Sequence, residues 1–178
     1  MQLFINKVYS MKTFIKKLLK EMLDDKSFGL PKPIDVNSDL LTKISTITLN
    51  DFEILENGDN GSNKMYLRIE FNDPSLEVVS DSIEFYVQII NDFIYHPHIF
   101  LNENLENKKL GSKILKKFIY EFGHAYLSKG RTINPKLFGM FKHFCETDSN
   151  LECIESDKGV LVTLVDNPIK DQLIEFMN

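Results

Sequence analysis

The sequence predicts an α+β protein with a mixed, mostly antiparallel sheet flanked by helices. Two patterns predict this class. Apolar and polar residues alternate over Lys64–Asn72, which is typical of a strand with one buried face. After Leu110 the apolar residues recur three and four apart, which is typical of a helix. The order of such segments is irregular, and this argues against a regular doubly wound parallel sheet.

The composition narrows the class further. The chain has 178 residues, of which 43% are hydrophobic and 26% charged, and it contains two cysteines. This is the composition of an ordinary globular protein, and it excludes a collagen-like repeat and a disulfide scaffold. We expect residues 39–178 to form one α+β domain. Residues 1–38 are expected to hold an amphipathic helix and a Pro-containing linker.

The first expected element is a short basic helix over residues 10–23, with Ser10 as its N-cap. Four interpretations stay open: packing on its own domain, docking into a partner's groove, binding a membrane surface, or a mitochondrial transit peptide. The acids at Glu21, Asp24 and Asp25 argue against the last. We expect a protein partner or a homo-oligomer, reached through Met11–Leu23. The apolar side is formed by Met11, Phe14, Ile15, Leu18, Leu19, Met22 and Leu23.

The elements of the domain follow in chain order. Strand-like sequence is expected over residues 44–56, 64–72, 82–90 and 93–101, although a helix is not excluded for residues 82–90. A helix follows from Leu110 to Phe122 and ends at Gly123. Residues 124–128 form a short strand, and Pro135 opens a second helix. A hairpin over residues 151–155 and 160–165 and a short helix over residues 169–177 complete the order.

The charge is distributed in blocks along the chain. The net charge of −5 divides into +3 for residues 1–30, −10 for 31–106, +8 for 107–145 and −6 for 146–178. A basic block inside an acidic chain marks where an anion or an acidic partner can bind, or else a solvated helix surface.

The cysteines and the N-terminus predict the compartment. Cys145 and Cys153 are expected to be reduced thiols, because no secretory signal precedes them. The longest apolar stretches are far shorter than the ~20 residues needed to cross a bilayer. We therefore expect a cytoplasmic protein without a membrane span, located in the host cytoplasm or the virion if a phage encodes it.

Residues 94–144 combine a strand, a loop ending in Leu110-Gly111-Ser112, a helix, a strand and a second helix. This segment resembles the central half of GNAT-fold N-acetyltransferases, most of all divergent phage-encoded members. In that family the loop's backbone N–H groups hold the pyrophosphate of acetyl-CoA at the helix N-terminus, where the helix dipole favours anions. The resemblance implies a cofactor-binding loop made of Lys109, Leu110, Gly111, Ser112 and Lys113.

Three residues depart from the family pattern. Lys109 stands where the family has its first glycine, and Glu106 stands where it has Gln or Arg. Phe141 stands where many members place a Tyr that protonates the departing thiolate. We therefore expect no catalytic residue and no cofactor, and a binding or structural module, for example in a phage virion. The alternative is an active acetyl-CoA-dependent N-acyltransferase with a divergent loop, in which proximity of amine and thioester suffices.

Two further kinds of site, a zinc site and a nucleic-acid contact, have some of their residues in the sequence. His96 and His98 alternate on one strand and could supply two zinc ligands, joined by His143, Cys145 or Cys153. Pro97 separates them and no second pair has typical spacing, so we expect no metal. Contact with nucleic acid through residues 107–145 is a weaker hypothesis, because the phenylalanines there have core spacing rather than that of a stacking platform.

Overall fold

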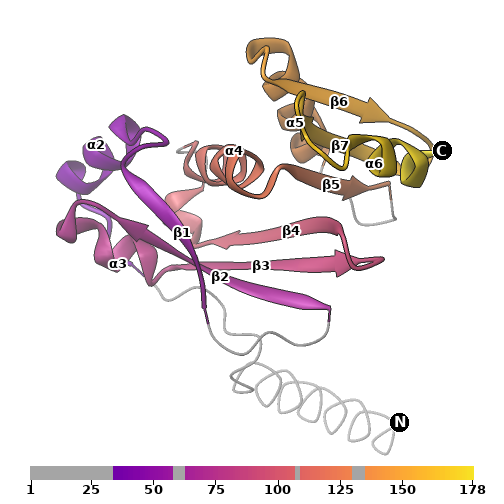
Figure 1. Cartoon of the computed structure of the whole chain (residues 1–178). Helices are drawn as coiled ribbons and strands as arrows, with labels where there is room; N and C mark the ends of the chain where they lie inside the picture. Colours follow the sequence, from indigo (N-terminus) through magenta and orange to yellow (C-terminus); the bar gives the residue numbers. More distant parts are fainter. Residues whose placement is uncertain (1–33, 58–62, 107–108, 130–134) are drawn as a thin grey trace, which may run out of the picture.

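The computed structural model describes residues 34–57, 63–106, 109–129 and 135–178. In this part of the chain the protein is α+β, with a four-stranded and a three-stranded antiparallel sheet and helices packed on them (Figure 1). The predicted helix Met11–Leu23 lies outside the described residues. The sequence predicts one sheet, but the described strands form two sheets.

The four-stranded sheet follows the chain order. It consists of β1 (Phe52–Glu56), β2 (Lys64–Phe71), β3 (Ile83–Ile90) and β4 (Ile94–Leu101). The strands predicted over residues 64–72, 82–90 and 93–101 are confirmed. The β3–β4 hairpin joins Ile90 to Ile94 through Asn91, Asp92 and Phe93, and the first two of these residues have positive φ.

A helix, α2 (Ser38–Thr46), occupies the start of the segment predicted as strand. The prediction over residues 44–56 is therefore wrong for Ile44 and its neighbours and confirmed from Phe52 onward. The side chain of Asn37 caps the helix by accepting from the Leu40 amide at 2.9 Å. Leu40 and Ile44, four residues apart, are buried together. The threonines and isoleucines here favour strands locally, but burial of one helical face overrides that preference.

The second sheet has the order β5–β7–β6. It is built from β5 (His124–Ser128), β6 (Leu151–Glu155) and β7 (Gly159–Leu164), as predicted for these segments. The central strand β7 is buried almost throughout. A Cβ at Gly159 would lie 2.2 Å from the Leu127 carbonyl oxygen, so only glycine fits at this crossing.

Three further helices pack on the sheets, and the sequence predicts all three. They are α4 (Leu110–Phe122), α5 (Pro135–Thr147) and α6 (Lys170–Met177). Short turns, η2 (Pro74–Leu76) with α3 (Glu77–Ser80) and η3 (Glu103–Leu105), follow β2 and β4. α4 ends at Gly123 with φ +86°, the left-handed C-cap expected of glycine.

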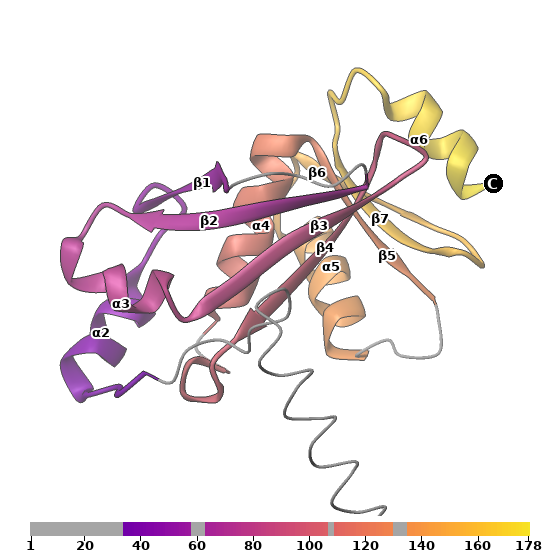
Figure 2. The same cartoon turned by 90° about the horizontal axis from the view of Figure 1, so that it is seen from below.

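The two sheets meet between β4 and β5, which share no hydrogen-bonded ladder. Near their starts the rings of Tyr95 and His124 stack at 4.8 Å. From there the two strands diverge, as Figure 2 shows.

The cysteines are paired, which corrects the expectation of reduced thiols. Cys145 near the end of α5 and Cys153 in β6 form a disulfide, and their Cα atoms are 6.0 Å apart. The pairing arises because β6 turns back beside the last turn of α5, a proximity that a separation of eight residues does not reveal.

Candidate anion site at the start of helix α4

The predicted cofactor loop lies at the N-terminus of α4, after β4 and η3. Lys109 precedes the helix with φ +61°, in the left-handed region that favours glycine. The family resemblance places a glycine at this position, and the backbone conformation of this chain favours a glycine there as well. Lys109 is exposed, and no side-chain hydrogen bond caps the helix within the described residues.

The next residues pack α4 against the sheet. Leu110 is fully buried in the main core. A Cβ at Gly111 would lie 3.3 Å from Leu101 Cδ1, so the absence of a side chain lets the helix approach the end of β4. Ser112 is half-buried on the first turn. Leu110 and Gly111 thus have packing roles that do not depend on a ligand.

Lys113 is turned toward α2. Its Nζ donates to the carbonyl oxygens of Ser45 at 3.0 Å and Ile44 at 3.5 Å, in the last turn of that helix. A cation at this end stabilises the exposed carbonyls and the helix dipole. Desolvation lowers the pKa of the Lys113 ammonium, the nearby Lys109 lowers it further, and Asp51 opposes both. This lysine is therefore engaged inside the protein.

Three further lysines of the basic block lie beside acids of the same chain. Lys116 lies 2.7 Å from Asp148, and Lys117 lies 3.1 Å from Glu121. Lys142 lies 3.0 Å from Glu155. Two of these three acids belong to the acidic block of residues 146–178, so the positive charge of these lysines is offset within the chain.

The family landmarks occupy different surroundings. Phe141 is 1% exposed and packs in the core near Phe144, so the position that the resemblance gives to a general acid carries no hydroxyl and does not reach solvent. Glu106 is exposed just after η3. Tyr126 in β5 is buried and donates from its hydroxyl to the Lys158 carbonyl at 2.8 Å.

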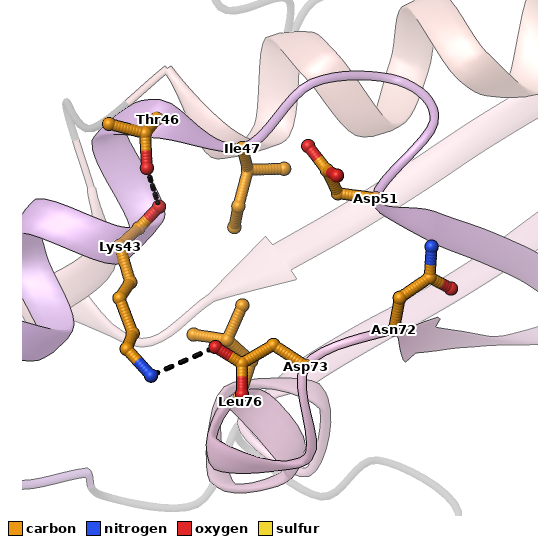
Figure 3. A pocket seen from close by; sticks show the side chains of 7 residues that line it. All are labelled: Lys43, Thr46, Ile47, Asp51, Asn72, Asp73 and Leu76. Atoms are coloured by element: carbon orange, nitrogen blue, oxygen red, sulfur yellow. Dashed lines mark hydrogen bonds and ion pairs between the residues drawn. The ribbon is translucent and has the colours of Figure 1, made fainter.

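A surface hollow of about 390 Å³ lies beside this region, between the end of α2 and the turn after β2 (Figure 3). Lys43 crosses it, donating to Asp73 at 2.9 Å and to Ser75 at 2.6 Å. The bond from Lys43, together with the bonds that Asp73 accepts from the Ser75 side chain and amide, lowers the pKa of the Asp73 carboxyl to about 2. Asp51 accepts from the amide and the hydroxyl of Thr48, which lowers its pKa as well.

The chemistry of this hollow follows from those pKa values. Both carboxylates are ionised at neutral pH and already hold donors, so neither is suited to act as a general base near pH 7. Lys43 and Asp73 tie α2 to the turn after β2, which is a structural role.

Histidines form a second cluster that the sequence indicated only in part. His96 and His98 on β4 have ring centroids 4.4 Å apart, and His124 on β5 accepts from the Tyr95 amide through Nε2 at 3.3 Å. Burial lowers the pKa of His96 and of His124 to about 4, so both are neutral at pH 7. Across the described ranges, no three histidine, cysteine or acidic side chains are placed to hold a metal ion.

No known protein family, curated protein or solved structure matches the chain. The class of protein is therefore defined by the fold alone: an α+β protein with two antiparallel sheets. None of the helices seen in residues 34–57, 63–106, 109–129 and 135–178 has the length and apolar character to cross a membrane.

Proposed function

We propose that the protein is a GNAT-like chain that has lost acetyl transfer and serves as a binding or structural module, such as a component of a phage virion. The observation that carries the proposal is the internal engagement of Lys113, whose ammonium binds the α2 carbonyls. A second support is Phe141, an apolar and buried side chain where the family resemblance asks for a proton donor.

Loss of the phosphate site has a simple physical basis. Pyrophosphate needs several convergent donors and net positive charge. The left-handed backbone at Lys109 keeps the geometry of the family's glycine, but the side chain adds bulk where the phosphate would approach. A protein that keeps the fold without the phosphate site can still bind other macromolecules, and in our proposal it does so through Met11–Leu23.

Calorimetry of the full chain with acetyl-CoA tests the proposal. We expect no binding heat up to millimolar cofactor, for the natural chain and for Lys109→Gly, which restores the family's glycine at a backbone that accepts it. Lys109→Gly should remain folded by circular dichroism. Micromolar binding that inorganic pyrophosphate competes away would overturn the proposal.

The alternative is an active acetyl-CoA-dependent N-acyltransferase. It is favoured by the divergence of β4 and β5 beyond Tyr95 and His124, which is the arrangement that would admit the cofactor's pantetheine arm (Figure 2). The test is release of free CoA thiol in the presence of amine acceptors. Release that depends on the protein would favour this alternative over the proposal above.

A further inference from the structure

The four-stranded sheet has two unlike faces. One packs against α4, where the ring centroids of Phe85 and Phe118 lie 5.6 Å apart. On the other, which we name the open face, Ile90 and Ile94 at the hairpin end share an apolar cluster with Leu173 and Met177 of α6, and no described helix covers the rest (Figure 1). By the alternation along each strand, the open face includes Glu53, Leu55, Lys64, Tyr66, Arg68, Glu70, Glu84, Tyr86, Gln88, His96, His98 and Phe100.

The open face is aromatic at its centre and apolar at its edges. Tyr86 stacks on His98 at 4.6 Å and lies 6.1 Å from Phe100. Phe100 on one edge strand is 44% exposed, and Leu55 on the other is 39% exposed. Large apolar side chains gathered around aromatic rings mark a surface that binds an apolar partner.

Two polar groups on the open face also lack suitable partners. Glu84 lies opposite Phe100 in the β3–β4 register, and desolvation alone raises the pKa of its carboxyl. His98 Nε2 is buried and has no hydrogen-bond partner among the described residues. A carboxylate accepts hydrogen bonds, so the occupant that suits Glu84 carries cationic donors as well as apolar side chains.

The chain itself contains a segment of this kind within reach. The described residues begin at Ile34, whose carbonyl oxygen accepts a hydrogen bond from Asn104 Nδ2 at 3.0 Å. Asn104 lies in η3, just after β4. Residues 24–33 can span up to about 35 Å when extended. A helix over residues 11–23 would be about 20 Å long, shorter than the roughly 26 Å of an eight-residue strand such as β4. A helix of this length therefore fits along the strands of the sheet.

We propose that Met11–Leu23 packs as an amphipathic helix on the open face, with its apolar side over Tyr86 and Phe100 and its lysines toward the glutamates. The open face carries three acids, Glu53, Glu70 and Glu84, against the two basic residues Lys64 and Arg68. The segment has the opposite excess, with Lys12, Lys16, Lys17 and Lys20 against Glu21. A partner that binds the same apolar stripe must displace the helix first, so the open face regulates the docking that the proposed function assigns to this segment.

Photo-cross-linking in the full chain tests this inference. A benzoylphenylalanine replaces Phe14 on the apolar stripe, and the matched control replaces Lys20 on the opposite side of the same helix. We expect the Phe14 probe to cross-link within one molecule to the peptide containing residues 84–100, and the Lys20 probe to give little product. Mixing isotope-labelled and unlabelled protein separates intramolecular from intermolecular products.

Substitutions on the open face give a second readout. Phe100→Ser should lower the yield of the Phe14 cross-link about fivefold or more. Val165→Ser removes a similarly exposed apolar side chain elsewhere and should leave the yield unchanged. Thermal unfolding of each variant reports whether the fold persists.

Three outcomes overturn the inference. They are the absence of products at residues 84–100, products formed only between two molecules, and binding of a labelled single-stranded oligonucleotide that Phe100→Ser abolishes. The second outcome assigns the open face to another copy of the chain, and the third assigns it to nucleic acid. Failure of this test leaves the acetyl-CoA result untouched, because the open face lies across the sheet from α4.

Discussion

Reduction of the Cys145–Cys153 disulfide is expected to destabilise the protein by about 2.5 kcal/mol. The bond closes a short loop, because the two cysteines are eight positions apart in the sequence. In the chain-entropy description, cross-linking a loop of about nine residues removes about 2.5 kcal/mol of freedom from the unfolded chain at 25 °C. For a protein of this size that corresponds to a fall in Tm of roughly 5–10 °C.

The assay compares thermal unfolding with and without a phosphine reductant, and counts thiols by alkylation and mass spectrometry. We expect no alkylation of the folded, unreduced protein and two alkylated thiols after reduction. The variant with both Cys145→Ser and Cys153→Ser is the control, since its Tm should not respond to the reductant. Alkylation of both thiols before reduction, or an unchanged Tm after it, would refute the reasoning.

Two further stability predictions follow from buried positions. Gly159→Ala should destabilise the protein by about 3 kcal/mol or more, because the added Cβ meets the Leu127 carbonyl oxygen. Gly139→Ala, on the open surface of α5, should instead stabilise it by about 0.5–1 kcal/mol. Urea titrations compare the free energies of unfolding of the two variants. The pKa of His124 falls from 6.5 to about 4 on folding, so between these values the unfolded chain binds more protons and stability declines as the pH falls. This decline is about 3 kcal/mol for the buried imidazole, and His124→Gln should reduce it while His143→Gln, an exposed control, should not.

Most of the fold is predictable because its strongest signals are local. The alternation in β2 and the three- and four-residue spacing in α4 each describe which face meets the core, and the structure follows them. α2 was missed because its threonines and isoleucines favour strands in isolation. The helix is decided instead by the Asn37 cap and by burial of Leu40 and Ile44 against distant parts of the chain.

The candidate site was predictable only as a position. Sequence placed Lys109–Lys113 at a helix start, and they lie there. Which way Lys113 points depends on α2, almost seventy residues earlier, and no local pattern carries that information. His124 was missed for the same reason, because its stacking with Tyr95 exists only where the two sheets meet.

The charge pattern shows that a block of like charges in the sequence need not form a charged surface in the folded protein. The block of +8 predicts an anion site, yet Lys116, Lys117 and Lys142 lie within ion-pair distance of acids of this chain. The Lys142–Glu155 pair is exposed and contributes only about 0–1 kcal/mol to stability, whereas the other two pairs are partly buried. Their consequence is for binding, because a cation that already has an anionic neighbour attracts a ligand less. With Lys113 bound to α2, Lys109 is the one basic residue of this block, within the described ranges, without a polar partner. Among the described residues at the start of α4, Lys109 is therefore the one lysine whose charge has no partner, and it lies three residues after the acidic Glu106.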